Sequence, residues 1–245
     1  MIPKVIHYCW FGGKSLPVSA IKCIESWKKF FPDYQIIQWD ESNFDVRCVP
    51  YVSEAYDARK YAFVSDYARF FILHKYGGIY FDTDVEVVAS LEDIIEKGPY
   101  MGMERTLSGD IAVNPGLGFA CPPGMPLLAE LLDNYLKIHF RRNDGTLDTT
   151  TIVKYTTDAL RNYGYRSENI IQESAGLTIY PTEYFCPLDY GTGQLHQTEN
   201  TRTIHRYAAT WHTAKDKLIR LKRVFFTEDQ IKRISAFLDR FRKKS

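Results

Sequence analysis

The sequence predicts an α/β fold whose sheet begins with two parallel strands. Residues 2–10 form an apolar segment typical of a first strand, and residues 34–40 form a second one. Between them, residues 18–31 repeat apolar side chains at helical spacing, and Pro32 follows. A strand, a helix and a second strand make a βαβ unit, in which the strands are parallel. We therefore expect a Rossmann-type mixed sheet flanked by helices.

The middle of the chain predicts two helices and a buried strand in direct succession. Residues 52–64 have a helical pattern, and a second helix is expected from Ser65, which can cap it, to Tyr76. The Gly77–Gly78 pair can end this helix, because glycine readily adopts the left-handed conformation. Residues 79–81 then form a short apolar strand. Further helices are expected at 91–97, 127–139 and 149–163, and further strands at 100–103, 178–181 and 184–188.

Composition is that of a globular enzyme and gives no sign of a nucleic-acid partner. Of the 245 residues, 45% are hydrophobic and 25% are charged, and the net charge is +1. The five cysteines are widely spaced without a Cys-x-x-Cys pair, which is typical of reduced thiols. The chain shows neither a signal-peptide pattern nor an apolar run of membrane-spanning length, so we expect a cytoplasmic protein.

Charge separates the C-terminal segment from the rest of the chain. Residues 214–245 carry eleven Lys or Arg and four Asp or Glu, a net charge of +7. We expect one α/β domain at 1–213 and a basic helical extension at 214–245, with a helix starting at Thr227 and an apolar stripe on one face. Two interpretations stay open. The stripe packs on the domain, or the helix binds the anionic inner face of a membrane as a peripheral anchor.

Two carboxylates, Asp82 and Asp84, follow the strand at 79–81. Residues i and i+2 of an extended chain point to the same side, so we expect both carboxylates to face one hard cation. Asp66 and Arg69 are three residues apart on the preceding helix and share a face, which would bring a guanidinium near that cation. Taken alone, the pattern is more typical of solvated turn carboxylates and a surface ion pair than of a metal site.

The full string from Ser65 to Asp84 resembles a known family. Ser-Asp-x-x-Arg, a helix, Gly-Gly-Ile-Tyr and Asp-x-Asp are similar to the metal-binding core of Och1-like glycosyltransferases with the DXD sugar-binding region, and of the clostridial glucosylating toxins. Residues 2–13 resemble the opening of capsular-polysaccharide members. The resemblance implies a GT-A-like fold and retaining transfer of a hexose from a nucleotide-sugar, with a UDP-sugar favoured. The acceptor would be a hydroxyl of a surface, capsular or lipid-linked glycan.

The resemblance also implies roles for single residues. Asp66 would accept hydrogen bonds from the hydroxyls of the donor sugar, and Arg69 would assist the departing diphosphate. Asn114 would lie beside the donor sugar, and Trp10 would stack on the base. The other positions expected to contact the donor are His7, Tyr80, Asp82 and Trp211.

The metal ligands implied by the resemblance are Asp82, Asp84 and a late histidine. His205 is the first candidate, and His212 is a rival for the same place. Carboxylates and an imidazole, with no thiolate close in the sequence, suit Mn²⁺ or Mg²⁺ better than zinc. Such a cation would neutralise the charge that develops on the diphosphate leaving group.

Two other functions stay open. Haloacid-dehalogenase-like phosphatases also carry Asp-x-Asp after a buried strand, but they have Thr or Val two places after the second Asp, where this chain has Glu86. Their later acidic motif is matched only weakly by Gly109–Asp110 together with Asn114. The second alternative is a non-catalytic sugar-binding protein. The presence of all four charged residues of the motif, Asp66, Arg69, Asp82 and Asp84, is evidence against it.

Overall fold

The computed structural model describes residues 1–106 and 108–208. Trp211, His212 and the basic extension at 214–245 lie outside these residues, so the roles expected for them stay predictions. Within the described ranges, no helix combines the length and the apolar character that crossing a membrane requires.

Strands and helices alternate along the first part of the chain, as the sequence predicts. The helices are α1 (Val18–Phe30), α2 (Pro50–Asp57), α3 (Tyr61–Tyr76), α4 (Glu92–Ile95), α5 (Pro126–Tyr135), α6 (Ile152–Arg161) and α7 (Thr182–Phe185). The strands are β1 (Val5–Cys9), β2 (Gln35–Trp39), β3 (Gly78–Tyr80), β4 (Val85–Val87), β5 (Tyr100–Arg105), β6 (Ile111–Asn114), β7 (Phe119–Cys121), β8 (Gln172–Ser174), β9 (Leu177–Tyr180) and β10 (Thr203–His205).

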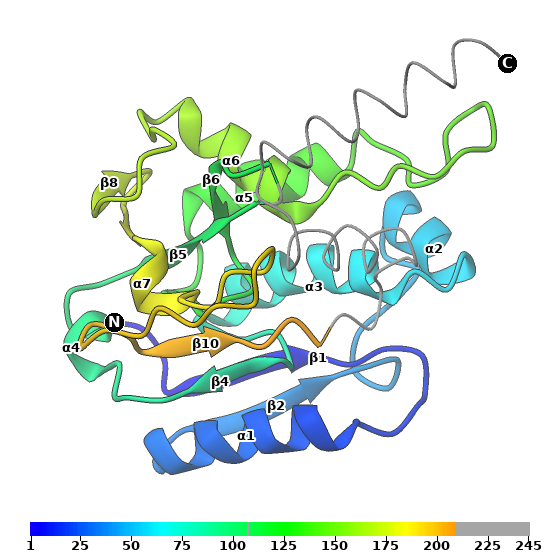
Figure 1. The fold of residues 1–245 in the computed structure, drawn as a ribbon. Coiled ribbons are helices and arrows are strands. Elements are labelled where there is room, and N and C mark those ends of the chain that lie inside the picture. The colour runs from blue at the N-terminus through cyan, green and yellow to red at the C-terminus, as the bar shows by residue number, and fades with distance from the viewer. Residues whose placement is uncertain (107, 209–245) are drawn as a thin grey trace, which may run out of the picture.

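The main sheet is mixed and begins parallel. Its strands lie in the order β2-β1-β3-β7-β5-β9-β8, and β6 pairs with β5 as the eighth strand. β1 is parallel to both β2 and β3, whereas β7 is antiparallel to β3 and β5. The predicted βαβ start and the mixed sheet are therefore confirmed. A second, two-stranded sheet pairs β10 with β4 (Figure 1).

Helices cover both faces of the main sheet, and each face has its own apolar core. α1 lies on one side together with the β10-β4 pair, and α3, α5 and α6 lie on the other (Figure 1). Trp27 and Phe81 belong to the first core, and Phe70 and Tyr135 belong to the second. The α/β fold flanked by helices, which the sequence predicts, is thus the observed one.

Two predicted element boundaries are wrong for local reasons. The break between α2 and α3 falls at Arg59, which has a φ of 57°, so Ser65 lies inside α3 instead of capping it. Its hydroxyl donates to the carbonyl of Tyr61 at 3.1 Å. Residues 184–188 do not form a strand, because a single helical turn, α7, follows Pro181 and ends at Phe185.

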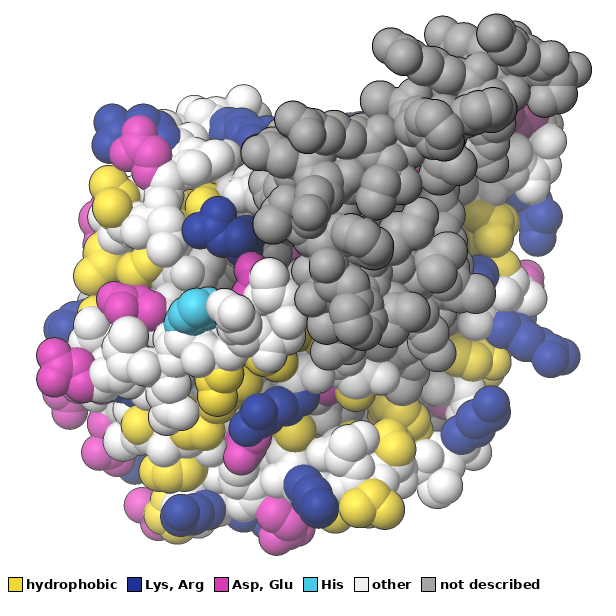
Figure 2. All heavy atoms as spheres, viewed as in Figure 1, with side chains coloured by type: hydrophobic (Ala, Val, Ile, Leu, Met, Phe, Trp, Pro, Cys, Tyr) yellow, Lys and Arg dark blue, Asp and Glu magenta, His cyan; other side chains and the backbone are white. Residues whose placement is uncertain are grey.

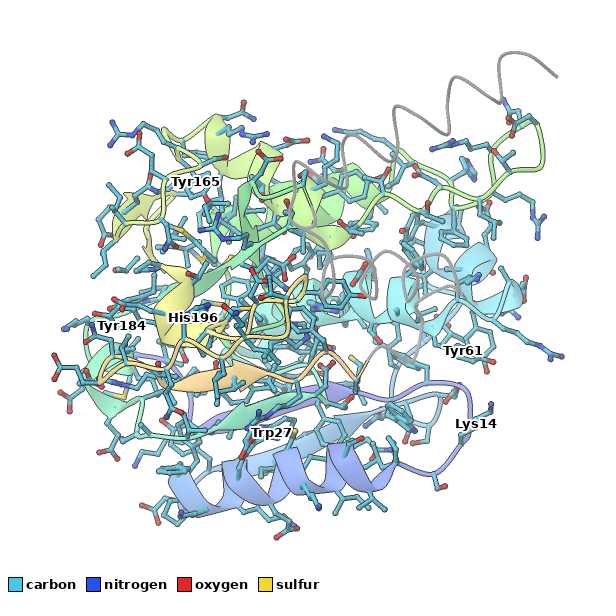
Figure 3. The ribbon with its side chains drawn as sticks, in the orientation of Figure 1. Lys14, Trp27, Tyr61, Tyr165, Tyr184 and His196 are labelled. Atoms are coloured by element: carbon cyan, nitrogen blue, oxygen red, sulfur yellow. The ribbon has the colours of Figure 1, made fainter. Side chains whose placement is uncertain are left out.

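α1 anchors the strand that leaves the Asp-x-Asp motif. Trp27 is completely buried, and its indole N–H donates to the carbonyl of Val85 at 2.7 Å. The Ser26 hydroxyl accepts a hydrogen bond from the amide of Val87 at 2.9 Å. Trp27 lies between α1 and β4 (Figure 3), and these contacts fix β4 and therefore the loop before it.

Charged side chains of both signs are interspersed over the face shown in Figure 2. Among the described residues on this face, no patch of a single sign is visible. Proteins that bind nucleic acid through the phosphate backbone present a concentrated basic surface. The described residues of this face do not form such a surface.

We predict that Gly78→Ala destabilises the protein more than Gly13→Ala. Both glycines have positive φ values, 101° and 68°, so both substitutions strain the backbone by about 1–3 kcal/mol. A Cβ at Gly78 would also lie 2.6 Å from the carbonyl oxygen of Val5 in β1, whereas no atom lies within 4 Å of one at Gly13. Urea unfolding of both variants measures the difference, and equal losses would show that the β1-β3 contact tolerates a side chain.

Candidate active site

Arg69 is the buried centre of the charged cluster. It lies on α3 and is only 4% exposed. Its Nη2 donates to Oδ1 of Asp66 at 2.9 Å, and its Nη1 lies 3.2 Å from both carboxylate oxygens of Asp82. The guanidinium also lies over the Tyr80 ring, 4.7 Å from its centroid. The expected approach of Asp66 and Arg69 to the Asp-x-Asp motif is therefore observed, and the pair is buried rather than on the surface.

The charges in this cluster determine one another's protonation. Burial raises the pKa of Asp66 to about 7; Arg69 lowers this pKa, and the charge of Asp82 raises it. Burial also acts to lower the pKa of Arg69, but Asp82, Tyr80 and Asp66 outweigh it and raise that pKa. Arg69 therefore stays protonated, and together with the Tyr80 hydroxyl, which donates to Oδ1 of Asp82 at 3.2 Å, it holds the Asp82 carboxylate in one orientation.

Asp84 contacts different residues from those that hold Asp82. The chain forms a turn here, in which the amide of Val85 donates to the carbonyl of Asp82 at 3.0 Å. The expectation of an extended chain at this point is therefore wrong, whereas the shared cation stays a prediction. Oδ1 of Asp84 lies 3.2 Å from Nε2 of His205. Its Oδ2 accepts a hydrogen bond from the amide of Ala208 at 2.9 Å.

β10 brings His205 to Asp84 from the far end of the described chain. β10 is antiparallel to β4, and His205 lies opposite Val85. Burial acts against the charged form of both side chains, but the charge and hydrogen bond of His205 bring the pKa of Asp84 below its usual value. Burial likewise acts to lower the pKa of His205, and Asp84 raises it well above the usual value. Without a cation, the two side chains therefore form an ion pair.

Asn114 ends β6 and is joined to the Asp-x-Asp motif by consecutive hydrogen bonds. Its Nδ2 donates to Oε2 of Glu104 at 2.8 Å, and its Oδ1 accepts from the amide of Gly116 at 2.7 Å. The carbonyl of Gly116 in turn accepts from the amide of Asp82 at 2.9 Å. The side chain predicted to lie beside the donor sugar is thus fixed at both ends.

Gly116 packs directly against the charged cluster. A Cβ at this position would overlap Oδ2 of Asp82 and would lie 2.8 Å from Nη1 of Arg69. Its φ is not among the positive ones, so the close approach, and not the backbone conformation, requires glycine here. Gly116 therefore sets the distance between the β6-β7 turn and the carboxylate.

His7 and Tyr80, expected to contact the donor, have internal partners instead. His7 is 1% exposed, and burial lowers its pKa to about 4 despite its hydrogen bond to Gly77. Its Nδ1 accepts from the indole N–H of Trp39 at 3.1 Å and its Nε2 donates to the carbonyl of Gly77 at 3.0 Å, so both ring nitrogens are used. Tyr80 is also 1% exposed. Both side chains are therefore buried and bonded within the protein, and we do not include them among the donor contacts.

Trp10 follows β1 and is partly exposed. Its indole N–H donates to the carbonyl of Lys14 at 2.6 Å, which fixes the ring within the loop after β1. The stacking of this ring on a base stays a prediction.

Glu104 is the site residue that the sequence reasoning missed. It lies near the end of β5, and burial raises the pKa of its carboxyl, with His205 and the hydrogen bond from Asn114 acting against this. The sequence feature that could have indicated Glu104 is its position directly after the apolar run at 100–103. A charged residue in a buried strand is costly unless it is paired, so it marks a candidate functional position.

Comparison with known families identifies the segment that carries the charged cluster. Residues 17–100 match the family described as glycosyltransferase sugar-binding region containing DXD motif. This range runs from α1 to the start of β5 and includes Asp66, Arg69, Asp82 and Asp84. The segment is therefore similar to this glycosyltransferase family, and the resemblance seen in the sequence is confirmed.

Two curated proteins are similar to parts of the chain. Inositol phosphoceramide mannosyltransferase 3 of Schizosaccharomyces pombe is 33% identical over 143 residues, which cover 57% of this chain and 38% of that protein. Uncharacterized glycosyltransferase L373 of Acanthamoeba polyphaga mimivirus is 34% identical over 108 residues, which cover 40% of this chain and 41% of that protein. The matched regions thus span about two fifths of the length of these curated relatives.

Two solved glycosyltransferase structures also superpose on part or most of the chain. PaToxG glycosyltransferase gives a TM-score of 0.48 at 19% identity, over 66% of this chain and 69% of that one. A glycosyltransferase involved in the glycosylation of the major capsid of PBCV-1 gives 0.46 at 10% identity, over 91% and 98%.

We predict that Arg69→Met destabilises the protein by about 3–5 kcal/mol, because it leaves two carboxylates without their buried partner. Arg47→Met is the matched control. Arg47 pairs with Asp57 at 2.7 Å on the surface, and both side chains are more than half exposed, so this variant should unfold almost like the parent. Guanidinium unfolding monitored by circular dichroism measures both, and similar midpoints would contradict a structural role for the Arg69 cluster.

Proposed function

We propose that this protein is a metal-dependent, retaining hexosyltransferase that moves a sugar from a nucleotide-sugar to a hydroxyl of a glycan or glycolipid. The observation that carries the proposal is the arrangement at the end of β3. Asp82 is held by Arg69 and Asp84 is paired with His205, and the two aspartates lie in the segment that matches the DXD glycosyltransferase family. A surface turn would leave these carboxylates solvated and free to move.

In this proposal Asp66 and Arg69 position the donor. Nη2 of Arg69 bonds one oxygen of the Asp66 carboxylate. The other oxygen would accept a hydrogen bond from a sugar hydroxyl. The fixed, planar guanidinium would bind phosphate oxygens of the donor, a task for which arginine is better suited than lysine. Asn114, locked between Glu104 and Gly116, would orient the sugar from the other side.

The donor atoms around Asp84 fit a hard divalent cation such as Mn²⁺ or Mg²⁺. Carboxylate oxygens of Asp84 and Asp82 and the Nε2 of His205 are the side-chain groups that would hold it, and the Asp84–His205 ion pair shows that an anionic and a basic donor already adjoin. When bound, such a cation supplies positive charge for the diphosphate leaving group. The protein's own part is to keep Asp84 ionised and oriented through the amide of Ala208.

The relatives suggest which substrates to examine first. One similar protein is named an inositol phosphoceramide mannosyltransferase. We therefore add GDP-mannose to the UDP-hexoses as candidate donors, and lipids with a hydroxylated head group to the surface glycans as candidate acceptors. A lipid acceptor fits the proposed peripheral association of a cytoplasmic enzyme with the membrane, because the basic segment 214–245 would meet anionic lipid there.

The direct test is a screen of the purified protein against UDP- and GDP-sugars with Mn²⁺, in which release of the nucleotide is measured. Slow hydrolysis of one donor without an acceptor, faster with an added acceptor, is the expected result. The anomeric configuration of the product, determined by NMR, tests retention. Release of phosphate from small phosphoesters with no turnover of any nucleotide-sugar would instead favour the phosphatase alternative.

We predict that Asp84→Asn lowers nucleotide-sugar turnover at least about 100-fold, as expected when one charge-stabilising group is lost. EDTA should abolish turnover in the parent, and added Mn²⁺ should restore it. Glu86→Gln is the control, because Glu86 lies two residues away and pairs with Arg206 near the surface. Full activity of the parent in the presence of EDTA would rule out metal dependence. Equal losses of turnover in Asp84→Asn and Glu86→Gln would rule out a specific role of Asp84.

We predict that Gly116→Ala lowers turnover per folded molecule by about 100-fold, the cost of displacing a positioned group by about 1 Å, and also lowers thermal stability because it disturbs a buried ion pair. The added methyl displaces Asp82 and Arg69, whereas the backbone conformation suits any residue. Gly124→Ala should lower thermal stability and keep normal turnover, since its φ of 75° strains alanine but its surroundings are open. Turnover per folded molecule and melting temperature, measured together, separate the two cases. Normal turnover in Gly116→Ala would show that the cluster does not need this close approach.

A further inference from the structure

We propose that Glu104, Cys186 and His205 form a second cation site, of the thiolate-containing kind that zinc prefers, behind the Asp84 side of the active site. Each of these residues offers one donor atom, and the three atoms all lie within 4.8 Å of one another. In the part of the chain that the structure describes, this is the one set of three such donors. A carboxylate, a thiolate and an imidazole are the common protein ligands of zinc.

Three segments far apart in sequence converge to form this site. Glu104 comes from β5, Cys186 directly follows α7, and His205 comes from β10. Because each element is fixed by its own pairing or packing, the donors are held in place before any cation binds. Such preorganisation distinguishes a site from a chance encounter of flexible side chains.

His205 has one ring nitrogen for each of the two sites. Its Nε2 lies beside Asp84 at 3.2 Å. Its Nδ1 is buried and has no hydrogen-bond partner among the described residues. A buried polar atom without a partner is costly and calls for an explanation. We assign this nitrogen as the donor of His205 in the proposed site, where a cation bound by Glu104 and Cys186 would be its partner.

Cys186 is suited to this role by its surroundings. It is 5% exposed, and its sulfur lies 3.0 Å from the hydroxyl oxygen of Tyr207, a further polar group next to the site. A surface cavity of about 240 Å³ is lined by Cys186, Arg105 and Asp189 among others. His196, on the loop between α7 and β10 (Figure 3), lines the same cavity. On binding, the S–H bond of Cys186 is replaced by a sulfur–metal bond and the Nδ1–H bond of the His205 imidazolium by a nitrogen–metal bond, and both protons leave to solvent.

The shared histidine couples the two sites, and this consequence rests on the proposed function. Soft thiolate ligands select zinc over Mn²⁺ or Mg²⁺. Zinc held through Nδ1 withdraws electrons from the imidazole and restrains its orientation, so Nε2 becomes a poorer ligand for the cation at Asp84. We therefore expect zinc to inhibit Mn²⁺-dependent transfer through Cys186.

The first experiment needs no activity. The full-length chain, freed of metal by a chelator, is titrated with Co²⁺ and with Cd²⁺, and thiolate-to-metal charge-transfer absorption is recorded. One equivalent should give the band in the parent and in Cys48→Ser, which removes the exposed cysteine, but not in Cys186→Ser. Competition with Zn²⁺ should show affinity weakened at least about tenfold in Cys186→Ser. A parent without the band, or a Cys186→Ser variant that keeps it, overturns the proposal.

A second measurement uses the parent alone, in case Cys186→Ser does not fold. The ¹¹³Cd NMR shift of the loaded protein distinguishes a site with one sulfur ligand from a site with oxygen and nitrogen ligands only. The sulfur-containing shift is expected, and an oxygen and nitrogen shift overturns the proposal.

The last experiment tests the coupling. Zinc should inhibit Mn²⁺-dependent turnover in the parent and in Cys48→Ser but not in Cys186→Ser. Equal inhibition of all three would place the zinc at Asp84 and refute the coupling. A protein with no transfer activity at all would contradict the proposed function, while the spectroscopic result would still decide the metal site.

Discussion

The candidate site depends on one buried guanidinium that lies between two carboxylates from different elements. Arg69 and Asp66 both belong to α3, whereas Asp82 follows β3, so the ion pairs fix the rotation of the helix relative to the strand. The Tyr80 ring below the guanidinium adds an attractive contact to a cation that has lost its water. A buried charge with only one of these partners would be destabilising. The cluster is therefore stable only when the helix and the strand end are both in place.

Features of the fold and of the candidate site are predictable from the sequence when the interacting groups lie close together along the chain. The βαβ start and the strand that leads to Asp82 depend on local periodicity, on Pro32 and on the two glycines after α3, so the sequence predicts them correctly. The turn at 82–84 is not predictable in this way, because it is closed by a single hydrogen bond from the amide of Val85 to the carbonyl of Asp82. Its effect is large, since it sends the two carboxylates to different partners.

The missed residues belong to the part of the site that long-range contacts create. Glu104 meets Asn114 across the β5-β6 pair, and Gly116 meets Asp82 only because β7 adds to β3. No local pattern records these encounters. The resemblance to a family supplied Asn114 and His205, and the structure adds the physical reason for both: one is fixed by two hydrogen bonds, and the other lies opposite Val85 in a small separate sheet.

Glu104 joins the two halves of the site. One of its oxygens accepts from Asn114, which is linked through Gly116 to Asp82 on the side where the donor sugar is proposed to lie. The same carboxylate lies within 4.8 Å of donor atoms of Cys186 and His205. A carboxylate that coordinates a cation is a weaker hydrogen-bond acceptor. A cation bound by Glu104 and Cys186 would therefore weaken the hydrogen bond from Asn114 to Glu104. If both proposals hold, the Glu104 carboxylate would couple the sugar side and the metal side of the site through its hydrogen bond with Asn114 and its contact with the cation.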